Sequence, residues 1–122
     1  MRSYAAGVAY DEDLADRVRE LVAEEPGLSE KRMFGGLAFL LHGNMAVGVS
    51  RDGGLLVRCD PDQTDALVAK GAHPMVMRGR EATGWLRVTD DDVRTKRRLS
   101  TWVGVGVKAA RAHPPKVAKR KR

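Results

Sequence analysis

The residues best suited to metal binding or nucleophilic catalysis are one cysteine and three histidines, and they lie far apart in the chain. They are Cys59, His42, His73 and His113. Structural zinc sites take four ligands, usually as two closely spaced pairs, and none of these residues has such a neighbour. We therefore expect no metal site and no cofactor.

Cys59 is also a poor candidate for a nucleophile. It comes directly before Asp60, whose negative charge raises the pKa of a thiol rather than lowering it. The sequence favours a small buried or edge cysteine at this position. A small-substrate enzyme would require a pocket that brings Cys59 within hydrogen-bond reach of a histidine and an acid.

The acidic and glycine-rich clusters have structural explanations. The run Asp90–Asp92 is dense, but capping and the helix dipole favour acidic residues at a helix N-terminus. The pairs Gly35–Gly36 and Gly53–Gly54 fit neither the P-loop pattern nor the dinucleotide-binding pattern. We expect no catalytic residue, and the chain is predicted to be non-enzymatic.

The most distinctive segment runs from Lys31 to Gly36, where two cations precede two large apolar residues and two glycines. Two interpretations stay open. In the structural one, Met33 and Phe34 fill a core or an interface, and the glycines permit a bulge or an unusual turn. In the functional one, the glycines expose backbone while Arg32 and Phe34 present a recognition surface. The candidate interaction residues are Arg32, Met33, Phe34, Gly35, Gly36 and Trp85.

The net charge of +6 is concentrated at the C-terminus. The last seven residues include Lys116, Lys119, Arg120, Lys121 and Arg122. Without these five, 17 of the 22 basic residues remain against 16 acidic ones, so the body is close to neutral. Such a tail either attracts nucleic-acid phosphates without sequence preference or keeps the protein in solution. No aromatic residue lies among its charges to stack on bases.

Length and composition indicate one cytoplasmic domain. The chain has 122 residues, 43% of them hydrophobic, which is typical of a single globular domain. With a single cysteine no intrachain disulfide can form, which favours a reducing compartment. No apolar run approaches the roughly 20 residues that cross a bilayer, and no signal peptide is evident.

The first half of the chain predicts one helix followed by strands. Leu14, Val18 and Val22 share one face of an amphipathic helix, Asp11 lies at its N-cap position, and Pro26–Gly27 ends it. The strands after this helix are joined by short connections, so we expect them to be antiparallel neighbours. Extended segments are expected at 31–34, 37–42, 45–50 and 55–58.

The second half predicts a short helix, two strands and a last helix. Asp60 caps the short helix, Pro61 begins it and Gly71 closes it. Asp90–Asp92 opens the last helix and Pro114–Pro115 stops it. Strands are expected at 75–77 and 84–88. The expected fold is α+β, a single antiparallel sheet with helices packed on one face. Its expected order, α-β-β-β-α-β-β-α, counts three strands between the first two helices.

Several stretches together resemble the N-terminal domain of the TfoX/Sxy family. They are Ala9–Glu12, Glu30–Phe39, Asn44–Val49, Gly79–Arg80 and Gly84–Val88. The resemblance covers about residues 9–112 and implies a bacterial origin, a fold like the secretion chaperones and a link to the regulation of competence genes for DNA uptake. It supplies no catalytic residue. Many members have Pro-Met where this chain has Glu81-Ala82, and the founding regulators carry a second domain where this chain has a basic tail.

The sequence therefore divides into a flexible N-terminal extension at 1–8, a TfoX N-terminal-like domain at 9–112 and a disordered basic tail at 113–122. The leading hypothesis is a regulatory module that binds a protein partner, with possible dimerisation through a sheet face or an edge strand. The alternative is a nucleic-acid-associated accessory protein anchored by its tail. No membrane partner is expected.

Overall fold

A computed structural model describes residues 10–33, 35–77 and 79–114. Three parts of the sequence-based predictions lie outside these residues. They are the flexible extension at 1–8, the candidate interaction residue Phe34, and the basic tail residues Lys116, Lys119, Arg120, Lys121 and Arg122.

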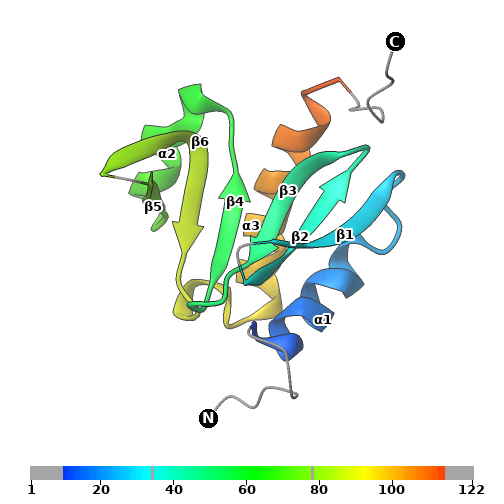
Figure 1. The fold of residues 1–122 in the computed structure, drawn as a ribbon. Coiled ribbons are helices and arrows are strands. Elements are labelled where there is room, and N and C mark those ends of the chain that lie inside the picture. The colour runs from blue at the N-terminus through cyan, green and yellow to red at the C-terminus, as the bar shows by residue number, and fades with distance from the viewer. Residues whose placement is uncertain (1–9, 34, 78, 115–122) are drawn as a thin grey trace.

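Six strands form one fully antiparallel sheet in the order β1-β2-β3-β4-β6-β5 (Figure 1). The strands are β1 (Leu28–Met33), β2 (Gly36–Leu41), β3 (Asn44–Val49), β4 (Leu55–Arg58), β5 (His73–Met77) and β6 (Arg80–Val88). The single antiparallel sheet predicted from the sequence is confirmed. β4 pairs with β6, so β5 lies at one edge of the sheet and β1 at the other.

Three helices accompany the sheet: α1 (Glu12–Val22), α2 (Thr64–Ala69) and α3 (Lys96–Arg111). Figure 1 shows α3 crossing behind the strands, and α3 contacts β3 and β4 along its length. The core lies between this helix and the sheet, where Phe39, Val47, Leu55 and Leu99 are almost fully buried. The three helices lie on one face of the sheet, as predicted, and none of the residues that the structure describes places a helix on the opposite face.

The structure has four strands before α2, one more than the predicted order counts. The segments expected at 31–34 and 37–42 are two separate strands, β1 and β2, which pair as a hairpin with Met33 opposite Gly36. Gly35 lies in the connection with φ +78, a backbone conformation that glycine adopts without the steric cost of a Cβ. β1 also begins earlier than expected, at Leu28.

The first two helix starts follow the predicted capping. The carboxylate of Asp11 accepts hydrogen bonds from the backbone N–H groups of Asp13 and Leu14. Asp60 accepts a hydrogen bond from the N–H of Asp62 and caps a 3₁₀ turn at Pro61–Gln63 that leads into α2.

The predicted start of the last helix is wrong. Asp91–Val93 forms a separate 3₁₀ turn, and α3 begins after Thr95, whose hydroxyl oxygen accepts from the N–H of Arg98. The acidic residues serve the preceding loops instead, because Asp90 accepts from the N–H of Gly54 and Asp92 accepts from Thr89. In this segment Asp90 and Asp92 therefore accept hydrogen bonds within loops, and Thr95 caps the helix.

No helix in the described part of the chain combines the length and apolar character that crossing a bilayer requires.

Candidate functional site

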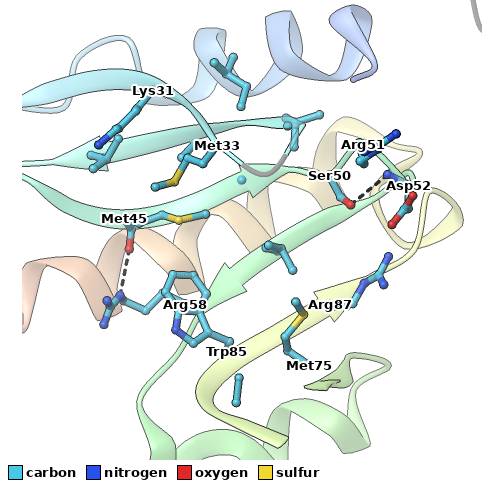
Figure 2. Close-up of a pocket in the computed structure, with 18 of the residues that line it drawn as sticks. Lys31, Met33, Met45, Ser50, Arg51, Asp52, Arg58, Met75, Trp85 and Arg87 are labelled. Carbon is cyan, nitrogen blue, oxygen red and sulfur yellow. Dashed lines mark hydrogen bonds between the residues drawn. The ribbon is translucent and has the colours of Figure 1, made fainter. Parts of the chain in front are cut away.

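An open groove of about 990 Å³ lies on the face of the sheet that the helices leave uncovered. Figure 2 shows Lys31 and Met33 on one side of it and Arg58, Trp85 and Arg87 on the other, with Met45 between them. Its lining comes from all six strands and from the β3–β4 connection. The groove is therefore a property of the assembled sheet and not of one loop.

Strand alternation determines which side chains face the groove. Successive residues of a strand point to opposite faces, so Leu55 and Val57 of β4 enter the core while Leu56 and Arg58 line the groove. In β6, the core residue Leu86 likewise lies between two groove residues, Trp85 and Arg87.

The floor of the groove is made of small residues. Across the sheet, Lys31 pairs with Ala38, Ala38 with Gly48, Gly48 with Leu56, and Leu56 with Arg87. A long side chain thus lies at each end of this row, while an alanine and a glycine lie near its middle. A Cβ on Gly48 would lie 2.6 Å from the methyl group of Met45, which covers this glycine. Ala38 and Gly48 are themselves buried, and Met45 forms the surface of the groove above Gly48.

The groove is lined by apolar side chains that can adapt their shape. Met33, Met45 and Met75 come from three different strands and join Leu56 and Trp85. Methionine is unbranched and polarisable, so it fits surfaces of varied shape. Methionine side chains therefore suit a surface that binds the apolar groups of another molecule.

Four cations flank this apolar surface: Lys31, Arg51, Arg58 and Arg87. Asp52 is the acidic residue among the described lining residues. Within the described chain, none of the four cations forms an ion pair with an acidic side chain. The groove therefore carries a positive charge that the fold itself leaves unbalanced.

Arg58 is the most firmly positioned of these cations. Its Nε donates a hydrogen bond of 3.0 Å to the carbonyl oxygen of Met45, and its guanidinium lies 4.8 Å from the centre of the Trp85 ring. Its Nη1 also lies 3.3 Å from Nε2 of His113. Arg58 thus connects the groove to the end of α3, where the buried side chain of Asn44 donates to the carbonyl of Pro114.

The structure brings together part of the predicted interaction set. Met33, Gly36 and Trp85 all line the groove although they are distant in sequence. Gly36 is fixed by packing, because a Cβ there would overlap the carbonyl oxygen of Val49. Arg32 is exposed and lies outside the groove, since it alternates with Lys31 and Met33 along β1. The predicted set is thus divided between two surfaces.

Sequence reasoning did not select Met45, Leu56, Arg58 or Arg87 as site residues. The available signal was period-two alternation: Leu56 and Arg58 alternate with the apolar residues Leu55 and Val57, and Arg87 lies between Leu86 and Val88. This pattern shows that these side chains leave the core. It does not show that β4 and β6 are neighbours, which is what gathers them into one groove.

The residues considered for metal binding and catalysis remain dispersed. In the described ranges, no group of three or more histidine, cysteine, aspartate or glutamate side chains is arranged to hold a metal ion. Cys59 is 3% exposed, and burial raises the pKa of its thiol, with a smaller contribution from the charge of Asp60. Its hydrogen-bonding neighbour is the hydroxyl of Thr64 at 3.9 Å. Cys59 therefore lies in the core and outside the groove.

Comparison with known proteins gives one family. The family model described as the TfoX N-terminal domain matches residues 20–110, which include all six strands and most of α3. A search of curated proteins finds no match to the chain.

Proposed function

The chain belongs to the TfoX N-terminal domain family, and we propose that it is a non-enzymatic regulatory module that binds a protein partner through the groove on its sheet. The regulatory part of this proposal rests on the family resemblance, which implies a link to competence genes. The single cysteine, which can form no intrachain disulfide, supports a cytoplasmic location for this activity.

The uncovered groove is the observation that carries the proposal. A sheet normally buries its apolar face against another layer, and here the face opposite the helices presents methionine, leucine and tryptophan side chains. Surfaces with contiguous apolar residues and a polar rim mark interaction sites. Aromatic residues, methionine and arginine are the types enriched at protein interfaces, and this groove contains all three.

Site-specific photo-crosslinking in living cells tests the proposal. A photoreactive amino acid replaces Thr83, which is exposed in the groove, or Thr101, which is exposed on α3 away from it. We expect a discrete protein adduct from position 83 and none from position 101. No adduct from position 83, or the same adducts from both positions, would contradict protein binding through the groove.

A second candidate function is nucleic-acid association through the tail. Five of the last seven residues are basic, and the charge excess of the chain lies there. With about five phosphate contacts, binding to duplex DNA would fall with salt on a log–log slope of about −4 to −5. Binding by the full chain, compared across a salt series with a chain that ends at Pro115 and so keeps the Pro114 carbonyl bonded to Asn44, tests this candidate. A flat salt response would exclude it.

A further inference from the structure

Two acidic side chains near the groove strands form ion pairs on the helical side of the sheet. Glu30 and Lys31 are neighbours on β1, but Glu30 pairs with Arg19 of α1, while Lys31 lines the groove. Glu25 is likewise paired, with Arg111 of α3. Acidic side chains at these positions are therefore used within the fold, whereas the groove cations face outward without acidic partners.

The segments on either side of the described residues carry no acidic side chain. Residues 1–9 contain no aspartate or glutamate, and residues 115–122 contain only basic and uncharged side chains. A second copy seated groove to groove would place two sets of cations opposite each other, which costs free energy. A partner of opposite charge therefore complements the groove better than a second copy of this chain does.

We propose that the groove receives an amphipathic, acidic helix of a partner protein, with its apolar stripe on the methionines and its carboxylates on the flanking cations. This inference rests on the proposed function and specifies the partner. Lys31 and Arg87 are separated by four strand spacings of about 4.8 Å, or about 19 Å, and a helix with its side chains is about 10–12 Å wide. A helix seated on Met45 and Leu56, above the buried row of small residues, therefore fits between the cations on the two sides.

The composition of the groove favours this partner over a single-stranded nucleic acid. Nucleic-acid grooves of this type stack successive bases on several aromatic side chains. Among the described lining residues Trp85 is the aromatic one, and Arg58 already lies over one face of its ring. Apolar helix faces docked on methionine-rich surfaces are a recurrent mode of peptide recognition.

Peptide binding by the full-length chain tests the inference. The probe is a fluorescent helical peptide of about 20 residues, long enough to form a helix, with a leucine stripe flanked by glutamates. A control peptide has lysine in place of every glutamate. Anisotropy titrations with wild-type protein should show binding of the glutamate peptide at least about tenfold tighter than that of the lysine peptide, because like charges oppose the second complex.

Charge reversal in the groove locates the binding. In the double variant Lys31→Glu with Arg87→Glu, affinity for the glutamate peptide should fall by about tenfold or more, and the lysine peptide should become the tighter ligand. The matched control reverses two exposed cations away from the groove, Lys70 at the end of α2 and Arg97 in α3, to glutamate. This control should change affinity by less than about twofold, since distant surface charges are screened by salt.

Three outcomes would overturn the inference: no binding of the glutamate peptide by wild type, an equal loss in the control variant, or no exchange of preference in the reversed groove. Displacement of the bound peptide by a thymidine homopolymer would assign the groove to nucleic acid and also overturn it. If Thr83 gives a protein adduct in cells but the glutamate peptide does not bind, the chemistry of the partner is wrong while the proposed function stands. If Thr83 gives no adduct, the proposed function itself fails.

Discussion

Two glycines of α3, only two positions apart, have opposite surroundings. A Cβ on Gly106 would overlap the carbonyl oxygen of Ala46 and lie 2.6 Å from a methyl group of Val47. A Cβ on Gly104 would meet nothing within 4 Å. At Gly106 the helix therefore lies too close to the backbone of β3 to admit a side chain, whereas Gly104 only weakens the helix.

Alanine substitutions at these glycines should change stability in opposite directions. Gly104→Ala should raise the free energy of unfolding by about 0.5–1 kcal/mol through helix propensity. Gly106→Ala should lower the free energy of unfolding by about 1–2 kcal/mol, because the added methyl group collides with the backbone of β3. The cost of this collision exceeds the gain in helix propensity. Urea unfolding monitored by circular dichroism measures both. A stabilised Gly106→Ala variant would show that α3 is not held this close to β3.

The reactivity of Cys59 should depend on unfolding. The residue is 3% exposed and its pKa is raised by burial, so little thiolate forms and reagents have little access. We expect labelling by a thiol reagent at pH 8 to be at least about tenfold slower in the native protein than in urea. Equal rates in the two conditions would place Cys59 at the surface.

For single residues, the sequence predicted burial and capping better than it predicted which distant residues lie side by side. The character of Cys59 and the cap formed by Asp11 follow from adjacent residues, and both were predicted. That Met33 and Trp85 share one groove depends on the pairing of six strands, which no local pattern contains. The role of Gly106 was also unpredictable, because the sequence does not show which strand the helix packs against.

Between elements, an ion pair joins α1 to β1. One edge of the Arg19 guanidinium donates two hydrogen bonds to Glu30, from Nε to Oε2 at 2.7 Å and from Nη2 to Oε1 at 2.9 Å. The hydrogen bonds from Arg19 lower the pKa of Glu30 below its ordinary value of 4.5. The side chains are 40% and 33% exposed, so solvent screening limits the contribution to about 0.5–1 kcal/mol.

The stabilisation from this pair should disappear in acid. Because the pKa of Glu30 is depressed on folding, its contribution is complete above the ordinary value of 4.5 and is lost as the pH falls through the lowered pKa. Glu30→Gln should therefore be less stable than wild type at pH 7 by up to about 1 kcal/mol, and the two should converge on acidification. The matched control is Glu20→Gln, which changes an exposed acidic residue of α1. A difference that persists at low pH would mean that packing and not charge is lost.

Element types were largely predictable, whereas their ends and number were less so. The first helix, the antiparallel sheet and the last helix appear as the periodicity indicated. The start of α3 was misplaced because Asp90 and Asp92 bind loop groups, and Thr95 provides the cap instead. The segments at 31–34 and 37–42 were both expected, but the predicted order did not count them as two strands, which the reversal at Gly35 separates into β1 and β2.

For the whole molecule, the near-neutral body conceals an uneven charge distribution. The fold uses acidic residues on the helical side, as in the pairs of Arg19 with Glu30 and Arg111 with Glu25. It leaves Lys31, Arg87 and two further arginines around an apolar groove on the other side. Net charge could be read from the sequence, but the gathering of four cations around one apolar groove required the sheet order. This gathering is what makes the groove a candidate for an acidic partner.

The most direct test of the account is the yield of the Thr83 photo-adduct in cells as the charge of the groove is changed. The account predicts an adduct in the wild-type background, its loss when Lys31 and Arg87 are both reversed to glutamate, and its retention when Lys70 and Arg97 are reversed instead. Immunoblotting after ultraviolet exposure, normalised to protein level, measures the yield. An adduct that persists unchanged in the reversed groove would contradict the claim that this charged, apolar surface is where the protein binds its partner.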